Sequence, residues 1–272
     1  MNDKILIFGK GYIGSRLQEA LDCRSSQKRI RVYRDAEEEL LKFKPKVIIN
    51  CIGHIGRNVD DCEKDIDKTL FANSFAPMIL AEAALRNRIK LVHISSGCIY
   101  HYDYAKDPPI SEEKPPDFYE LFYSRSKVYS EKVLEWLSLR YPILVIRIRV
   151  PLDNRPHPRN LLNKLITYRK VIDLPNSVTY IPDFLEAIRH LLDRDARGFY
   201  NIVNQGPLEY RELMEVYRKY KPEFNYEVIK FASLGQVRTN LVLSAEKLQK
   251  TGFKVRPIRE VLEECVREYL KY

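Results

Sequence analysis

The 272-residue chain has only five cysteines, and no two of them form a CxxC pair. Scattered cysteines, odd in number, argue against a disulfide framework or a zinc site and favour a reducing compartment. No apolar run approaches the roughly 18 residues that a membrane-spanning helix needs. The first residues lead directly into a strand-like segment without a signal-peptide pattern. We therefore expect a cytoplasmic protein without a membrane partner.

The chain also lacks any tract in which its basic residues gather. Lys and Arg number 46 against 37 Asp and Glu, a formal charge of +9, but no nucleic-acid-binding motif accompanies them. A solvated basic surface is the expected consequence, with anionic small ligands such as nucleotides as the alternative. Repeats and low-complexity segments are missing, and the histidines show no metal-binding spacing. We expect no nucleic-acid partner and no metal.

Short apolar segments alternate with amphipathic segments over the first 150 residues. We expect strands at 5–8, 30–33, 47–50, 90–96 and 143–148, and helices at 12–23, 36–43, 66–87 and 118–139. Nearly continuous apolar strands separated by helices predict a parallel sheet covered on both faces. The predicted fold class is therefore α/β, with a Rossmann-type doubly wound parallel sheet.

The alternation weakens after a polar, proline-rich loop at 151–160. We expect helices at 159–169, 183–194, 209–220 and 257–272, and strands at 199–203 and 226–231. This change predicts one domain over 1–150 and a smaller C-terminal α/β domain over 151–272, with chain crossings between the two.

Three glycines, Gly9, Gly11 and Gly14, follow the first strand and open the first helix. This spacing permits a tight turn and a close approach to a pyrophosphate at the helix N-terminus; the alternative is a glycine turn without a ligand. The second strand is expected to end at Arg34, and Asp35 comes next. An arginine there favours the 2′-phosphate of NADP, whereas an acid favours NAD. We predict NADPH as the cofactor, with NADH as the alternative.

Tyr123 and Lys127 lie four residues apart near the start of a predicted helix, so their side chains share one face. A phenol with a pKa of about 10 is a poor acid–base catalyst at pH 7, but a nearby ammonium lowers that pKa. Such pairs are common on helices. Downstream of the glycine motif and of a strand ending in Ser96, this pair is the best catalytic candidate. Cys98, two residues after Ser96, is either a small buried hydrophobic residue or a second residue with a chemical role beside that serine.

The motifs GKGYIG, SSGCIY and YSRSK together resemble the extended short-chain dehydrogenase/reductases that act on nucleotide sugars, over nearly the whole chain. The resemblance implies a catalytic group formed by Ser96, Tyr123 and Lys127. Six segments in order also resemble the nucleotide-rhamnose synthases of plants and giant viruses: NCIGHIGRNVDDCE, GCIYHYD, YSRSK, RIRVPLDNRPHPRNLLNKL, VIDLPNSVTY and RTNLVLSAEKL. These synthases unite a 3,5-epimerase and a 4-keto-reductase in one chain.

The narrower resemblance implies conversion of a UDP- or dTDP-4-keto-6-deoxy-glucose into the L-rhamnose nucleotide. It implies that Cys98 and Lys164 are the epimerase pair. Removing a proton beside the ketone gives an enolate, which needs pre-aimed hydrogen-bond donors. Inversion then needs acid–base groups on opposite sides of the sugar ring. Which of the two removes the proton stays open.

Three alternatives stay open. GDP-fucose synthases share the serine-x-cysteine-isoleucine-tyrosine run but use a histidine where this chain has RNLLNK, and His157 comes several residues too early. Enzymes that only reduce 4-keto-rhamnose nucleotides typically carry tyrosine at the position of Cys98. Some members of the superfamily are NADP-binding regulatory subunits without catalysis, and retention of the catalytic group argues against that class.

Further contacts are expected around this group. The substrate is expected to contact Ser96, Cys98, Tyr123, Arg159, Asn160, Lys164 and Arg238. Arg238 suits a diphosphate clamp, because guanidinium pairs with phosphate oxygens, although an ordinary surface arginine is the alternative. Besides the glycines and Arg34, cofactor contacts are expected at Tyr12, Ile13, Cys51, Gly53, Asn73, Tyr123, Lys127 and Pro151. The expected partners are a nucleotide sugar, a second copy in a homodimer and a nucleotide-glucose 4,6-dehydratase.

Overall fold

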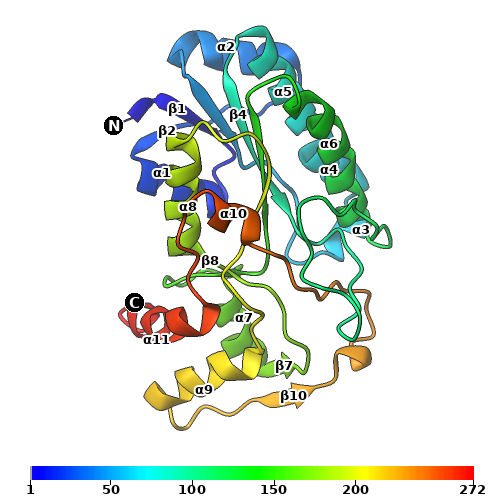
Figure 1. Ribbon diagram of the computed structural model, residues 1–272, viewed down its shortest axis with the longest axis vertical. Helices are drawn as coiled ribbons and strands as arrows, with labels where there is room; N and C mark the ends of the chain where they lie inside the picture. Colours follow the sequence, from blue (N-terminus) through cyan, green and yellow to red (C-terminus); the bar gives the residue numbers. More distant parts are fainter. Residues whose placement is uncertain (1) are drawn as a thin grey trace. The chain divides into compact units, whose positions relative to one another are not determined.

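The computed structural model describes residues 2–272, and the chain forms two units (Figure 1). The first unit holds the residues up to Ile99 together with Pro116–Arg147 and Arg189–Tyr200. The second unit holds Tyr100–Pro115, Ile148–Ile188 and Asn201–Tyr272. The chain passes into the second unit at Tyr100–Pro115 and returns to the first at Arg189–Tyr200, and the division at residue 150 with chain crossings stays a prediction.

The first unit is built on a six-stranded sheet in the order β2-β1-β3-β4-β5-β9. Its strands are β1 (Asn2–Phe8), β2 (Cys23–Ser26), β3 (Val47–Asn50), β4 (Lys90–Ser96), β5 (Ile143–Ile148) and β9 (Gly198–Ile202). β1 pairs in parallel with both β2 and β3, and β3 pairs in parallel with β4. The Rossmann-type sheet is confirmed. Its strand order changes direction between β1 and β3, the place where such sheets bind ligands.

One face of this sheet is covered by helices α2 (Tyr33–Phe43), α5 (Ala76–Arg86) and α6 (Phe122–Ser138) (Figure 1). Their buried side chains form one hydrophobic cluster with every second residue of the strands, among them Leu6, Phe8, Ile48, Leu91 and Val145. The helix α1 (Tyr12–Leu21) also belongs to this unit, and α8 (Ile181–Asp193) begins in the second unit and ends in the first. Strands buried on both faces explain the continuous apolar runs of the sequence.

The second strand lies at Cys23–Ser26, so its expected position at 30–33 was wrong. β2 is an edge strand of the sheet, and only Cys23 and Ser26 of its four residues are buried. A short edge strand with one polar face therefore lacks the apolar run on which the expectation depended. Ile30 is buried in the cluster on the α2 side without joining the sheet.

The helix expected over 66–87 is divided into α4 (Ile66–Leu70), a π-helical turn η1 (Phe71–Phe75) and α5. The short helix α3 (Asp61–Lys64) precedes them. A π-turn changes which way the side chains point, and such turns are frequent at functional sites. Here Asn73 and Ser74 of η1 both bond to Ser126 of α6. The interruption thus attaches this segment to α6.

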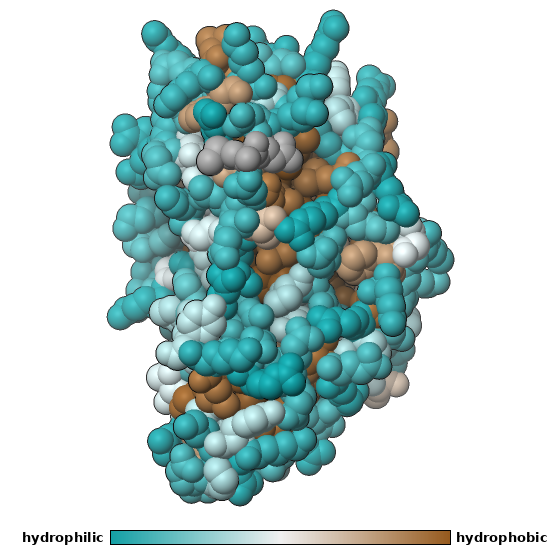
Figure 2. All heavy atoms as spheres, turned by 90° about the vertical axis from the view of Figure 1, so that its left-hand side faces the viewer, coloured by the Kyte–Doolittle hydropathy of each residue, from teal (hydrophilic) through white to brown (hydrophobic). Residues whose placement is uncertain are grey.

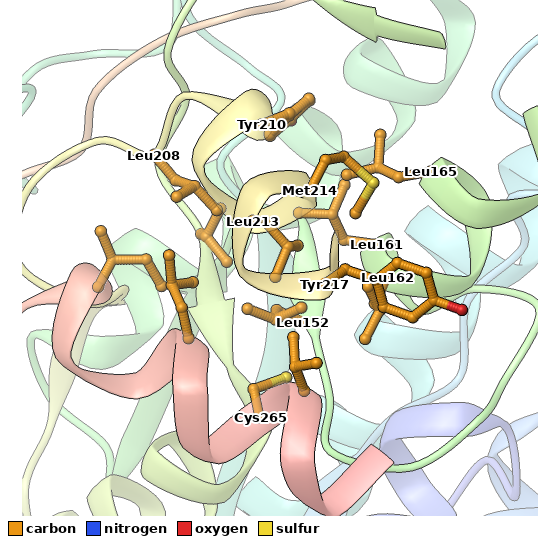
Figure 3. Packing of buried hydrophobic residues seen from close by; sticks show 14 of the residues in the cluster. Leu152, Leu161, Leu162, Leu165, Leu208, Tyr210, Leu213, Met214, Tyr217 and Cys265 are labelled. Atoms are coloured by element: carbon orange, nitrogen blue, oxygen red, sulfur yellow. The ribbon is translucent and has the colours of Figure 1, made fainter. Parts of the chain in front are cut away.

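The second unit contains two small parallel sheets and several helices. The strand pairs are β6 (Pro151–Leu152) with β8 (Thr179–Tyr180), and β7 (Lys170–Ile172) with β10 (Glu227–Ile229). The helices are α7 (Leu161–Tyr168), α9 (Tyr210–Tyr220), α10 (Glu246–Lys250) and α11 (Ile258–Tyr269), with a 3₁₀ turn η2 (Phe231–Ser233). Figure 3 shows side chains of α7 and α9 gathered with Cys265 of α11 in one buried cluster.

The face drawn in Figure 2 is covered mostly by hydrophilic side chains, between which apolar side chains are visible in separate patches. Across residues 2–272, no helix combines the length and the apolar character needed to cross a bilayer.

Candidate functional site

The loop between β1 and α1 places its three glycines in different roles. Gly9 has a φ of +95°, and a Cβ there would lie 2.5 Å from the backbone of Cys51 and Ile52. A Cβ on Gly14 would lie 1.9 Å from the carbonyl oxygen of Gly9, whereas a Cβ on Gly11 would meet no atom within 4 Å. Gly9 and Gly14 therefore permit the turn and the close packing of α1, and the side of the loop at Gly11 leaves room for a ligand.

A cavity of about 600 Å³ adjoins this loop, at the ends of β1, β2 and β3 and beside α4 and η1. Four cationic side chains contribute to its lining: Lys10, Lys28, Arg29 and Lys68. The N-terminus of α1 has Gly11 at its cap, and no side chain makes a cap hydrogen bond there. Free N–H groups and positive charge suit a pyrophosphate. The residues present therefore fit a dinucleotide.

The other predicted cofactor residues fall in different surroundings. Gly53 lines the cavity, and Tyr12 and Ile13 form the first turn of α1. The thiol of Cys51 lies below the loop, where burial raises its pKa to about 12. Pro151 belongs to β6 in the second unit. Gly53 is thus the one of these five that lines the cavity.

Arg34 does not lie at the end of the second strand, where the cofactor prediction placed it. It lies in α2, its side chain is 83% exposed, and its Nε donates to Glu38 at 3.2 Å. Asp35 accepts hydrogen bonds from the backbone N–H groups of Arg31 and Val32, which holds its pKa below its usual value. The residues that follow β2 and line the cavity are Gln27, Lys28 and Arg29. The premise for Arg34 was wrong because the strand was placed too late.

Ser96 and Cys98 occupy the end of β4 and the turn after it. The backbone N–H of Cys98 donates to Ser96 Oγ at 3.2 Å, and Ser124 Oγ of α6 donates to the carbonyl oxygen of Cys98 at 2.5 Å. The turn is thereby attached to the strand and to the helix that carries Tyr123. Ser96 is buried and Cys98 is half-buried. A hydroxyl that already accepts one hydrogen bond retains its own proton to donate to a substrate oxygen.

Tyr123 and Lys127 lie on α6, and both are buried. A Cβ on Gly53 would lie 3.5 Å from Lys127 Nζ, so the ammonium reaches the loop that lines the cavity. Burial lowers the pKa of Lys127 to about 8, and the nearby Glu131 opposes that shift. The lysine therefore carries its charge below about pH 8, where it favours the phenolate form of a neighbouring tyrosine.

Asn73 holds the backbone of the loop that follows β3. Its Oδ1 accepts the N–H of His54 at 2.9 Å, and its Nδ2 donates to the carbonyl of His54 at 2.9 Å and to Ser126 Oγ at 3.1 Å. The same Oδ1 would lie 3.3 Å from a Cβ on Gly53. Asn73, predicted as a cofactor contact, thus fixes the loop after β3 against α6.

Four predicted substrate residues lie in the second unit: Arg159, Asn160, Lys164 and Arg238. Lys164 is half-buried on α7, Arg159 is exposed, and Arg238 donates to its neighbours Val237 and Gln236. Asn160 is fully buried, with Oδ1 accepting from two backbone N–H groups and Nδ2 donating to two carbonyls. Its hydrogen-bonding groups are engaged in capping α7, so its expected substrate contact is corrected to a structural role.

Several residues of this region were not found from the sequence. Glu131, Arg147 and Ser95 form a buried network one helical turn from Lys127. Glu63 of α3 accepts the N–H of Phe122 at 2.5 Å and so caps α6 just before Tyr123. The spacing of four residues between Lys127 and Glu131 was the available signal. No local pattern indicates the contact of Glu63, because 59 residues separate the partners.

The fold, the glycine loop and the serine–tyrosine–lysine group define a short-chain dehydrogenase/reductase. Residues 3–271 match the family described as the RmlD substrate binding domain, and the chain belongs to this family. It is 29% identical to the bifunctional dTDP-4-dehydrorhamnose 3,5-epimerase/dTDP-4-dehydrorhamnose reductase of Arabidopsis thaliana, covering 97% of this chain and 92% of that protein.

A trifunctional UDP-glucose 4,6-dehydratase/UDP-4-keto-6-deoxy-D-glucose 3,5-epimerase/UDP-4-keto-L-rhamnose-reductase of Arabidopsis thaliana is 30% identical over 95% of this chain. The chain spans only 41% of that protein's length. Among solved structures, the UDP-rhamnose synthase from Acanthamoeba polyphaga mimivirus has a TM-score of 0.90 at 25% identity, covering 97% of this chain and 98% of that one. A dTDP-4-dehydrorhamnose reductase from Bacillus anthracis in complex with NADP shares the fold, with a TM-score of 0.84 at 21% identity and nearly complete coverage of both chains.

Proposed function

We propose that this chain is a bifunctional 3,5-epimerase and NADPH-dependent 4-keto-reductase. Its substrate is UDP-4-keto-6-deoxy-glucose or the dTDP form, and its product is the corresponding L-rhamnose nucleotide. The observation that carries the proposal is the half-buried Cys98 held directly beside Ser96, on a turn bonded to the helix of Tyr123 and Lys127. The names of the relatives support it, since several combine these activities in one chain.

In the reduction, the C4 ketone oxygen takes hydrogen bonds from the hydroxyls of Ser96 and Tyr123. When bound, NADPH supplies the hydride that adds to C4. The carbonyl π electrons move to oxygen, and Tyr123 gives its proton to that oxygen, leaving a phenolate. The Lys127 ammonium favours this phenolate, because an opposite charge nearby stabilises the charged form. Solvent then returns the proton to the tyrosine.

The epimerisation precedes reduction and uses the same two hydroxyls. A base removes the proton from C3 or C5, the C–H electrons form a C=C bond, and the ketone oxygen becomes an enolate. Ser96 and Tyr123 donate hydrogen bonds to that oxygen. An acid then returns a proton to the opposite face of the same carbon. We assign the base and the acid to Cys98 and Lys164, without deciding which is which.

We assign the dinucleotide to the loop of Gly9, Gly11 and Gly14 and to the N-terminus of α1, which carries no side-chain cap. We assign its 2′-phosphate to the segment after β2. Lys28 is already paired with Glu38 and Asp35. Arg29 is exposed and lines the cavity, so its guanidinium is the better candidate for a phosphate.

Replacing Arg29 by alanine is expected to weaken NADPH binding about tenfold and leave NADH binding nearly unchanged. A charge-assisted hydrogen bond contributes roughly 1.5–3 kcal/mol, and solvent exposure reduces that value here. Titration of both cofactors, followed by fluorescence, measures the ratio. Arg34→Ala is the matched control, since Arg34 is also exposed but lies outside the cavity lining. A selective loss of NADPH affinity in Arg34→Ala would instead favour the helix α2 as the phosphate site.

Product analysis tests the proposed function most directly. Purified protein, NADPH and UDP- or dTDP-4-keto-6-deoxy-glucose are incubated side by side, and the sugar nucleotide is identified by NMR. Oxidation of NADPH with formation of an L-rhamnose nucleotide supports the proposal. Turnover confined to a GDP sugar favours a GDP-fucose-synthase-like enzyme. Absence of turnover on UDP, dTDP and GDP sugars contradicts the enzyme proposal and favours a regulatory subunit.

The substrate must come from a reaction that oxidises C4 and removes the C6 hydroxyl. A nucleotide-glucose 4,6-dehydratase therefore stays the proposed functional partner. The trifunctional relatives carry that activity in their name, and this chain matches less than half of their length. A homodimer stays a prediction.

A further inference from the structure

A buried carboxylate lies behind the catalytic group. Glu131 on α6 is 2% exposed, and its Oε2 accepts from Arg147 Nε at 3.0 Å and Nη2 at 2.7 Å. Its Oε1 accepts from Ser95 Oγ at 2.5 Å. Arg147 on β5 is 4% exposed, and its guanidinium lies 4.8 Å from the centre of the Phe199 ring. Both carboxylate oxygens are therefore engaged inside the first unit.

This carboxylate connects two elements that carry the proposed chemistry. Ser95 directly precedes Ser96 at the end of β4, and Glu131 follows Lys127 by one turn of α6. The hydrogen bond from Ser95 thus ties the strand end to the helix of Tyr123. A buried, charge-assisted hydrogen bond of this kind has a strict geometry and restrains both partners.

The charge of Glu131 also acts on Lys127. Lys127 is only 5% exposed, and burial of an ammonium is strongly unfavourable unless an opposite charge compensates it. Burial is the largest influence on its pKa, and Glu131 is the strongest influence in the opposite direction. Cys51, Cys62 and Cys98 raise the pKa of Lys127 less than Glu131 does, and the charge of Lys127 in turn lowers the pKa of His93. Burial holds His93 neutral and keeps the thiols of Cys51 and Cys62 protonated, so the Glu131 carboxylate, which is also paired with Arg147, is the anion with the strongest favourable influence on the Lys127 ammonium.

We propose that Glu131 is a positioning residue that keeps the buried Lys127 ammonium charged and locks the end of β4 to α6. For its effect on catalysis the inference rests on the proposed function. The carboxylate touches neither substrate nor cofactor, and it acts through Lys127 and Ser95.

The first test titrates Lys127 without using activity. The protein is labelled with ¹³C-lysine, the Cε resonance of Lys127 is assigned with Lys127→Arg, and its pH midpoint is compared between variants. Glu131→Gln preserves the shape of the side chain and is expected to lower the midpoint by at least one pH unit, a tenfold change in the protonation equilibrium. An unchanged midpoint in Glu131→Gln would overturn the electrostatic role.

Two matched variants separate charge from packing. Ser95→Ala removes the connection to β4 but keeps both charges, so the midpoint is expected to stay and kcat to fall. Leu134→Ala destabilises the same helix without a change of charge and is expected to keep the midpoint. If Glu131→Gln does not fold, Glu131→Gln with Arg147→Met removes both buried charges, and a lowered midpoint is again expected. A lowered midpoint in Leu134→Ala would assign the effect to loosened packing and contradict the proposal.

The second test is the pH dependence of kcat for reduction. The loss of activity at high pH is expected to begin about one unit lower in Glu131→Gln than in the unsubstituted protein, because Lys127 loses its proton earlier. Identical pH profiles with a shifted midpoint would show that Lys127 charge is not needed, which overturns the catalytic part. If the unsubstituted protein turns over no nucleotide sugar, the proposed function fails, while the lysine titration still decides the role of Glu131.

Discussion

Replacing Cys98 by alanine is expected to abolish solvent-deuterium incorporation at C3 and C5 of the sugar while NADPH binding persists. Cys98 is half-buried, and its backbone is anchored to Ser96 and Ser124, so the thiol has a defined place beside the proposed ketone site. General acid–base groups contribute roughly 10²–10⁴ in rate, and loss of one half of an acid–base pair removes inversion rather than slowing it slightly. Mass spectrometry of substrate incubated in heavy water measures the exchange.

The control for this experiment is a second thiol of the same unit. Cys62 on α3 is fully buried, and its Sγ contacts the carbonyl oxygen of His54 at 3.7 Å. Cys62→Ala is expected to cost some stability and to leave deuterium exchange in place. Unchanged exchange in Cys98→Ala would return Cys98 to a packing role and favour a reductase without epimerase activity. Loss of NADPH binding in that variant would point to a misfolded turn instead.

Replacing Tyr123 by phenylalanine is expected to lower kcat for NADPH oxidation by roughly 10²–10⁴, with cofactor affinity nearly intact. The substitution removes the phenolic proton that the reduced oxygen needs and keeps the ring that packs at the start of α6. Stopped-flow measurement of NADPH absorbance follows the step. The hydroxyl of Ser96 and the ammonium of Lys127 remain, which explains why some activity is expected to survive.

Tyr129→Phe provides the comparison for Tyr123→Phe, because Tyr129 lies on the same helix with 45% of its surface exposed. That variant is expected to reduce the substrate at the unsubstituted rate. A kcat for Tyr123→Phe within threefold of the unsubstituted value would exclude the tyrosine as proton donor. Together with Cys98→Ala, the pair separates the two chemistries: one variant loses exchange, and the other loses hydride transfer.

Local sequence patterns were sufficient to predict features that depend on residues close together in the chain. The glycine loop at 9–14 was found from its spacing, and its close contacts explain that spacing. The strands at 47–50, 90–96 and 143–148 have the expected bounds, and nearly all of their residues are buried. The serine, tyrosine and lysine lie at the expected strand end and on the expected helix, and their catalytic role stays a prediction.

Local sequence patterns failed to predict features that depend on burial by, or hydrogen bonding to, residues distant in the chain. β2 is a short edge strand with a polar face, so its position and the role of Arg34 were misread. Asn160 was expected to contact a substrate, but its side-chain amide forms hydrogen bonds with the backbone around α7. The interruption of the 66–87 helix by a π-turn has no periodic signal, although it directs Asn73 to the loop at His54.

The sequence by itself determined the fold class and the residue types of the proposed catalytic group, because both depend on the order and spacing of side chains along single elements. Only the tertiary structure decided which cationic side chains line the cavity. It also decided that Glu131 bonds to Ser95, 36 residues away, and to Arg147, 16 residues away. A buried charge is stable only when partners from other elements surround it. Those partners are brought together by packing of the sheet against α6, which no local pattern encodes.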